Sequence, residues 1–126
     1  MALAEKIMGG GLSAGQAQAI CGDYAAIAAA GTTQGTGTVI NVGNSMIIGA
    51  DGTKGVTLVA TASPGESITI FNNSASTLKV YPPVGAAIAV AGTGIGTANT
   101  AFSQLTYKCT QYICFTATQW VAVTTA

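Results

Sequence analysis

Residues 67–83 read SITIFNNSASTLKVYPP, and this stretch indicates the class of fold. Apolar and polar residues alternate in Ser67–Asn72 and again in Thr77–Tyr81, as in strands that bury one face. The small polar residues of Asn72–Ser76 favour a turn between them. Pro82-Pro83 ends the second run, because proline cannot donate to a strand ladder. The stretch therefore predicts two strands that pair antiparallel, with their apolar side inward.

The same two-residue period continues from Thr32 onward, in segments rich in threonine, valine and isoleucine and separated by turn-forming residues. Short strands at such spacing predict an all-β fold, a single antiparallel β-sandwich or small barrel of about eight strands. No repeat of fixed period is visible, so a solenoid is not expected. The strand candidates are Gly37–Val42, Ser45–Gly49, Gly55–Ala60, Ser67–Asn72, Thr77–Tyr81, Ala86–Ala91, Ala101–Cys109, Gln111–Ala117 and Gln119–Thr124.

Apolar residues spaced two apart point to the same side of a strand, and they predict the core. Trp120 is expected as a further core or interface residue, because an indole buries a large area. The core pairs are Val56 with Leu58, Ile68 with Ile70, Leu78 with Val80, and Ile113 with Phe115.

Some large residues fall out of phase with these pairs and predict a surface for partners. They are Phe71, Lys79 and Tyr81 in the opening stretch, together with Tyr107 further along the chain. Aromatic faces with polar tips suit protein partners and also sugars.

Residues 1–31 are expected to be separate from a β-domain at 32–126. Met1–Gly11 ends in three glycines and predicts a flexible arm. Ser13–Cys21 predicts a short helix with Ser13 as its N-cap. The apolar arm residues Leu3, Ile7 and Met8 are candidates for contact with a partner that orders the arm.

The chain of 126 residues contains 6% charged residues, against about 25% in a typical domain, and has zero net charge. Four scattered lysines without arginine or histidine form no basic stripe, so nucleic acid is not an expected partner. The apolar runs are short and interrupted, which argues against a membrane span. The start of the chain also lacks the features of a secretory signal. So little charge suggests that much of the surface faces other subunits.

No catalytic, cofactor or metal site is predicted. Gly92–Thr97 reads GTGIGT, but a strand-like segment follows it instead of the helix that a dinucleotide fingerprint requires. The chain has no histidine to act as a base, and its four carboxylates are scattered, Asp51 and Glu66 lying in turns. Cys21, Cys109 and Cys114 are expected as buried thiols, with a disulfide between the last two left open.

Three segments together resemble small virion proteins of tailed bacteriophages. They are AGTTQGTGTVI at Ala30–Ile40, VTLVATASPGESITIFNNSASTLKVYPPVGAAI at Val56–Ile88, and YICFTATQWVAV at Tyr112–Val123. The resemblance lies in the order of these parts and spans about three-quarters of the chain. Ala89 stands where the family often has a polar residue such as asparagine.

The resemblance implies a β-sandwich subunit, assembled in the cytoplasm of an infected bacterium and carried on the virion as a homotrimer. The expected function is that of a capsid decoration (cement) protein, which binds the major capsid protein and stabilises the head. The alternative is a receptor- or glycan-binding head-fibre or tail module that uses Tyr81, Tyr107, Tyr112 and the glycine loop Gly92–Asn99. An enzyme is not expected.

Overall fold

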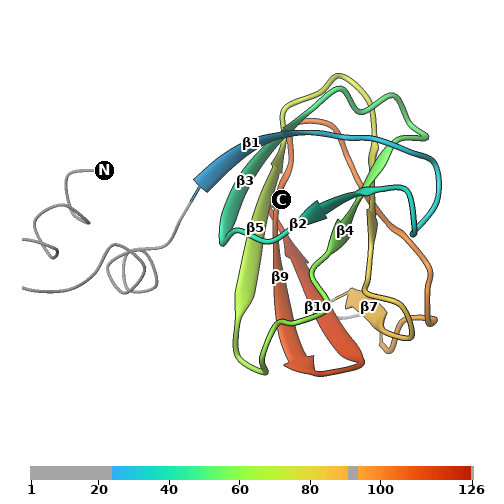
Figure 1. Cartoon of the computed structure of the whole chain (residues 1–126). Helices are drawn as coiled ribbons and strands as arrows, with labels where there is room; N and C mark the ends of the chain where they lie inside the picture. Colours follow the sequence, from blue (N-terminus) through green and yellow to red (C-terminus); the bar gives the residue numbers. More distant parts are fainter. Residues whose placement is uncertain (1–23, 91–93, 126) are drawn as a thin grey trace, which may run out of the picture.

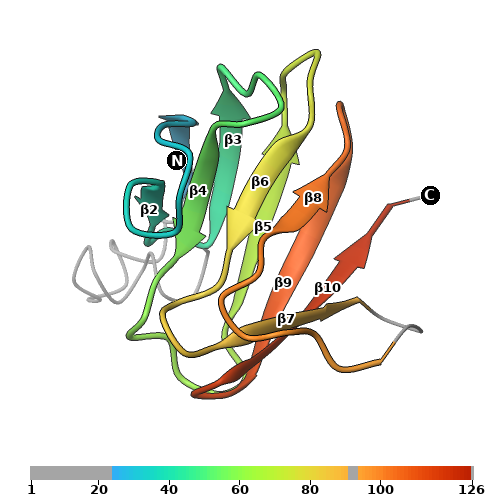
Figure 2. The same cartoon turned by 90° about the vertical axis from the view of Figure 1, so that its right-hand side faces the viewer.

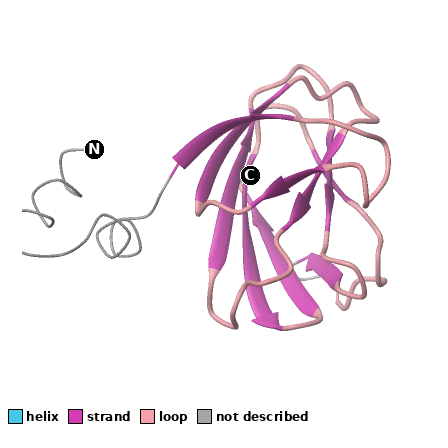
Figure 3. Cartoon of the chain, in the orientation of Figure 1, coloured by secondary structure: helices cyan, strands magenta, loops and turns pink. Residues whose placement is uncertain are grey.

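The computed structural model describes residues 24–90 and 94–125, which form two β-sheets around one hydrophobic core (Figure 1). Figure 3 shows strands and loops, and no helix, in this part of the chain. Figure 2 shows the four-stranded sheet B in front of the six-stranded sheet A. In spatial order, sheet A contains β1 (Tyr24–Ala28), β3 (Asn44–Ile48), β5 (Ser67–Asn72), β9 (Cys109–Thr116), β10 (Gln119–Thr124) and β7 (Ala87–Val90), and sheet B contains β2 (Thr38–Ile40), β4 (Gly55–Leu58), β6 (Leu78–Tyr81) and β8 (Phe102–Gln104).

The first six strands form a stack of parallel coils. The chain alternates between the sheets, so that β1, β3 and β5 lie in sheet A while β2, β4 and β6 lie in sheet B. Each strand from β1 to β4 pairs in parallel with the strand two places later. Ile47, for example, lies opposite Ile27 on one side and Asn72 on the other. One strand per sheet in each coil is the arrangement of a short β-solenoid, so the expectation that the chain contains no solenoid is wrong for these six strands.

The C-terminal strands close this stack with antiparallel pairs. In sheet A, β9 pairs antiparallel with β5, and β10 follows β9 as a hairpin. In sheet B, β8 pairs antiparallel with β6. β7 joins the far edge of sheet A in parallel with β10.

The prediction of an antiparallel sandwich is therefore correct in its all-β, sandwich-like character and wrong in strand direction. Five of the eight pairings between these strands are parallel. The predicted hairpin of Ser67–Pro83 is also wrong, because β5 and β6 lie in different sheets. Both edges of β5 are already paired, one with β3 and the other with β9, so β6 has no edge of β5 to join. Residues 73–77 cross from one sheet to the other.

The core lies between the sheets and confirms most of the predicted pairs. Six of the predicted residues, in β4, β5 and β6, are at most 5% exposed, and Trp120 is 1% exposed. The pair in β9 is wrong: Tyr112 and Cys114 are buried there, whereas Phe115 is 55% exposed. Ile113 shares the outward side with Phe115. Both sides of β9 carry apolar residues, so alternation alone could not set its phase. The confirmed residues are Val56, Leu58, Ile68, Ile70, Leu78 and Val80.

Each of the nine predicted strands has a counterpart, but one is much shorter than expected. The segment Ala101–Cys109 is not a single strand, because β8 ends at Gln104 and a turn precedes β9. Tyr107 in that turn has a φ of 57°, which is incompatible with an extended strand.

β1 was not predicted, since its sequence YAAIA is mostly alanine, a weak strand former. It lies ahead of Thr32, so the described sheet begins before the expected start of the β-domain. The arm Met1–Gly11 and the helix predicted at Ser13–Cys21 lie outside the described residues.

Candidate interaction surfaces

The outward side of sheet A, here called the outer A face, is built without a charged residue. It consists of the side chains that alternate with the core positions along β1, β3, β5, β9 and β10. Tyr24, Ile48, Phe115 and Val123 on it are 45–59% exposed. Its members are Tyr24, Ala26, Ala28, Asn44, Met46, Ile48, Ser67, Thr69, Phe71, Cys109, Gln111, Ile113, Phe115, Val121 and Val123.

Strand register arranges the outer A face in rows across the sheet. One row runs through Asn44, Thr69, Gln111 and Val123, which are neighbours in the pairings from β3 to β10. Beside this row is an open hollow of about 430 Å³. The hollow exposes hydroxyl, carboxamide and thiol groups together with a valine side chain. It is lined by Thr69, Cys109, Gln111, Val123, Thr124 and Thr125.

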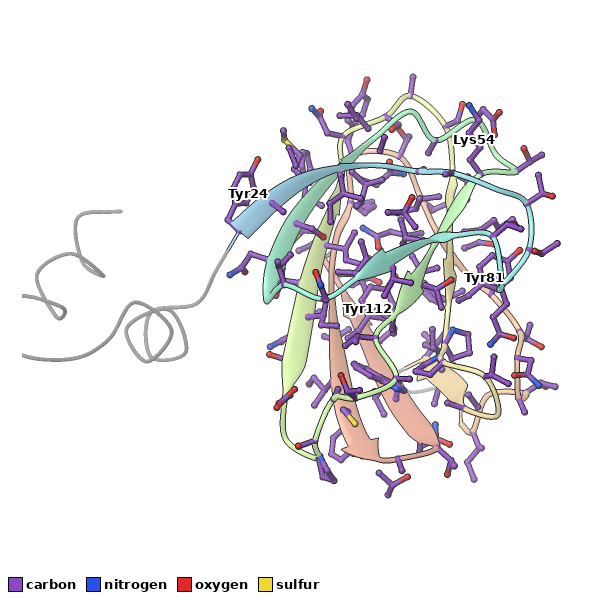
Figure 4. All side chains as sticks on the ribbon, in the orientation of Figure 1. Tyr24, Lys54, Tyr81 and Tyr112 are labelled. Carbon is purple, nitrogen blue, oxygen red and sulfur yellow. The ribbon has the colours of Figure 1, made fainter. Side chains whose placement is uncertain are left out.

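The structure does not bring the predicted partner residues together. Phe71 belongs to the outer A face, whereas Lys79 and Tyr81 project from β6 on the outward side of sheet B. Tyr107 lies in the β8–β9 turn and is 60% exposed. The expectation that Tyr112 belongs to a receptor- or glycan-binding surface is wrong, because its side chain is 0% exposed. In Figure 4, Tyr24 on β1 and Tyr81 on β6 lie on opposite sides of the molecule. The arm residues Leu3, Ile7 and Met8 lie outside the described residues.

The outward side of sheet B is partly covered by the segment between β1 and β2. The hydroxyl of Tyr81 donates to the carbonyl oxygen of Thr32 at 3.1 Å, and that of Thr57 donates to the carbonyl oxygen of Gln34 at 2.7 Å. Lys79 Nζ donates to Ser103 Oγ at 2.8 Å. Sheet B therefore offers less open apolar surface than sheet A.

A second apolar surface, here called the loop end, consists of residues 82–86 and 94–100 on either side of β7. Val84 is 84% exposed and Ile95 is 88% exposed. Asn99 joins the two loops: its Oδ1 accepts from Gly85 N at 2.7 Å, and its own N donates to Ala86 O at 2.9 Å. Its φ of 62° is a left-handed conformation that asparagine tolerates.

Gln34 ties the β1–β2 segment to the loop end. Its Nε2 donates to Pro82 O at 2.7 Å and to Asn99 Oδ1 at 3.2 Å. These bonds hold the backbone on either side of Val84 in one conformation. The sequence predicted this surface only in part: the glycine loop Gly92–Asn99 was expected in a receptor- or glycan-binding site, but the isolated Ile95 within it was given no weight.

Three polar side chains fully buried in the core tie the two sheets together. Tyr112 Oη donates to Gln104 Oε1 at 2.8 Å, and Gln104 Nε2 donates to the carbonyl oxygens of Ile70 and Lys108, each at 2.8 Å. Asn72 Nδ2 donates to two backbone oxygens where the β8–β9 turn begins, both at 3.2 Å. Burial raises the pKa of the Tyr112 phenol well above 10.0. Asn72 shares the phase of the apolar residues in β5, and this was the available sequence signal for the cluster.

The question of a disulfide between Cys109 and Cys114 is answered by their positions on β9. Both are free thiols, and they point to opposite sides of the strand, Cys109 outward and Cys114 into the core. Burial and, to a smaller extent, the carboxylate of Glu66 raise the pKa of the Cys114 thiol. Cys21 lies outside the described residues.

The carboxylate of Asp51 organises the turn between β3 and β4, as expected for a turn former. Its Oδ1 accepts from Lys54 N at 2.9 Å, from Thr53 Oγ1 at 2.7 Å and from Thr53 N at 3.0 Å. These hydrogen bonds, that of Lys54 N first, lower the pKa of Asp51 to about 2. Within residues 24–90 and 94–125, no group of three or more His, Cys, Asp or Glu side chains gathers as metal ligands.

Among the described residues there is no helix long and apolar enough to cross a membrane. Comparison of the chain with protein-family models, with curated proteins and with solved structures finds no match in any of the three.

Proposed function

We propose that this chain is a structural protein of a tailed-phage virion that decorates the assembled head and stabilises it. The proposal rests on the composition of the outer A face. A water-facing surface of a small domain usually contains about 25–35% charged residues with both signs interspersed. A five-stranded face of apolar, hydroxyl and carboxamide side chains, with no charge, is typical of the core of a protein interface.

The loop end supports a bridging role, because it gives the subunit a second apolar surface on different elements. A decoration protein contacts both the shell and further copies of itself. Val84 and Ile95 at the loop end, which are 84% and 88% exposed, are suited to contact with the major capsid protein. The hydrogen bonds of Asn99 reduce the ordering cost of such a contact, since the loops on either side already hold each other.

The arm residues Leu3, Ile7 and Met8 are proposed to add contacts to the shell, as expected from their apolar character. Neither nucleic acid nor membrane is proposed as a partner. The subunit is proposed to fold in the host cytoplasm and to bind to the outer surface of the head together with further copies of itself.

Binding to purified heads that lack this protein tests the proposal. The full-length chain is expected to cosediment with them saturably, to raise their resistance to heat, and to add density on the outer surface of the head in electron micrographs. Val84→Ser with Ile95→Ser is expected to weaken binding, whereas Val39→Ser, at a valine that is 56% exposed on sheet B, is expected to leave it unchanged.

Absence of cosedimentation would overturn the proposal. Density on the tail, with loss of adsorption to host cells in the double variant of Tyr81 and Tyr107 to alanine, would overturn it in favour of the receptor- or glycan-binding alternative.

A further inference from the structure

We infer that the outer A face binds the outer A face of a second copy of this chain. This inference concerns the occupant of one surface and stands on the chemistry of that surface alone. It holds whether the assembled particle is a phage head or another structure.

Charge favours a second copy as the occupant. Where two identical faces meet about a twofold axis, a charged residue near the axis lies close to its own like charge. The outer A face presents no charge, so its own copy meets no such repulsion. A partner selected by opposite charge, in contrast, finds nothing on this face to pair with. The five charged residues in the described part of the chain lie elsewhere, in turns, on sheet B or just ahead of a strand: Asp51, Lys54, Glu66, Lys79 and Lys108.

The hydrogen-bonding groups of the face are also complementary to themselves. Gln111 carries a carboxamide, and Ser67 and Thr69 carry hydroxyls. Each of these groups both donates and accepts, so the same set on a facing copy satisfies it. A face of carboxylates or ammonium groups, which only accept or only donate, lacks this property.

The shape of the face suits packing of one sheet on another. Aromatic and aliphatic side chains, including Phe71 and Phe115, stand on the outer A face, and facing sheets interdigitate such side chains about 10 Å apart. The hollow beside Thr69 and Gln111, about 430 Å³ in volume, leaves room for a side chain of the facing copy.

The area is sufficient for a stable contact. Five strands with a spacing of about 4.8 Å and a length of roughly 20 Å give a face of roughly 500 Å² in projection. A standard interface buries roughly 800 Å² per partner, and the corrugated side chains of the face add accessible area to its projection.

A matched pair of valine substitutions tests the inference by sedimentation velocity on the full-length chain, without any capsid, from 1 to about 200 μM. The wild-type chain is expected to form a dimer, because a face that binds the same face of a second copy closes a twofold pair. Val123→Lys, which places a charge on the outer A face, is expected to raise the dissociation constant at least tenfold. Val39→Lys, at a similarly exposed valine on sheet B, is expected to leave it unchanged. Thr69→Lys, in the middle of the face, serves as a second variant.

Circular dichroism and thermal unfolding verify that the variants fold. A wild-type chain that stays monomeric throughout the range overturns the inference. So does equal weakening by Val39→Lys, or no effect of both Val123→Lys and Thr69→Lys. Because no head is present, these outcomes are independent of the head-binding experiment that tests the proposed function.

Discussion

Removal of one buried hydroxyl group, in Tyr112→Phe, tests how strongly the core polar cluster ties the sheets together. The substitution keeps the ring, including its edge-to-face contact with Phe102 at 5.9 Å between centroids. It removes the donor that Gln104 Oε1 accepts at 2.8 Å, in a place where both side chains are 0% exposed. Gln104 Oε1 is then a buried acceptor without its donor, which costs about 1–3 kcal/mol.

The expected loss is measurable by both chemical and thermal unfolding. At about 2 kcal/mol, the melting temperature of a domain of about 100 residues falls by roughly 8–16 °C. Urea unfolding followed through Trp120 fluorescence is expected to show a lower midpoint with an unchanged slope, since the surface exposed on unfolding stays the same.

Tyr81→Phe is the matched control. The hydroxyl of Tyr81 donates to Thr32 O at 3.1 Å in an exposed position, where water replaces the lost partner. We expect the control to lower the free energy of unfolding by less than about 0.5 kcal/mol. Equal losses in Tyr112→Phe and Tyr81→Phe would refute the reasoning, because burial would then have no part in the cost.

Ionisation of the Tyr112 hydroxyl group is expected to make the protein less stable at alkaline pH. Burial raises the pKa of Tyr112 in the folded protein well above 10.0, whereas in the unfolded chain the phenol ionises near 10. The unfolded state therefore loses its proton first, and stability falls as pH rises above about 10, by up to about 1.4 kcal/mol per pH unit. Tyr112→Phe lacks this loss, so the difference between the two proteins is expected to shrink from pH 9 to 11. A constant difference in urea midpoints would contradict the prediction.

Further substitutions test the turns, the close approach of strands and the two faces of β9. The pKa of Asp51 is lowered from 3.8 to about 2, so the carboxylate stabilises the fold fully above the pKa of the unfolded chain, and this stabilisation is lost as pH falls toward 2. Asp51→Asn is expected to remove that part of the acid dependence of the melting temperature. Identical profiles of the two proteins from pH 5 to 2 would argue against this prediction. Gly55→Ala places a Cβ atom 2.6 Å from a backbone oxygen of β6, and is expected to lower the free energy of unfolding in urea by about 1–3 kcal/mol. The control Gly35→Ala adds a Cβ atom in open space and is expected to lower it by less than about 0.5 kcal/mol; similar losses in both variants would contradict the prediction. Iodoacetamide is expected to label Cys109 before Cys114 in the dilute folded protein, as read by peptide mass spectrometry, and the reverse order would place Cys114 outside the core.

The positions of most strands and much of the core could be predicted, because alternation is clear wherever one side of a strand is wet. In β6, Leu78 and Val80 alternate with Lys79 and Tyr81, and the inward side follows directly. In β9 the alternation is unclear because the outer A face is itself apolar. The apolar character that makes the outer A face a candidate interface is therefore also the reason why the inward side of β9 could not be predicted.

Strand pairing could not be predicted, because it depends on contacts between distant segments. The segment after β5 has the composition of a hairpin turn, yet it crosses between sheets because β9, far along the chain, occupies the free edge of β5. The coils escaped detection because their lengths differ. β1, β3 and β5 begin at residues 24, 44 and 67, so the spacing changes from 20 to 23 residues.

The positions of the candidate interaction residues in the fold could be predicted only in part. Phe71 was identified by its phase and lies on the outer A face, but Lys79 and Tyr81 were assigned to the same surface on the assumption of a hairpin. Because β5 and β6 lie in different sheets, Phe71 points to one side of the molecule, and Lys79 and Tyr81 point to the other. The loop end around Val84 depends on a hydrogen bond between loops fourteen residues apart, Gly85 to Asn99, which no local pattern indicates.

The stack of parallel coils has a consequence for how a chain of this kind changes in length during evolution. Each coil pairs only with its neighbours, and the antiparallel hairpin of β9 and β10 covers the last coil at β5. Duplication or loss of a whole coil therefore moves β1 and β2 away from or toward the hairpin and leaves the closure itself intact. Such a change would lengthen or shorten the outer A face by one strand, so the width of this face can change in steps of one coil.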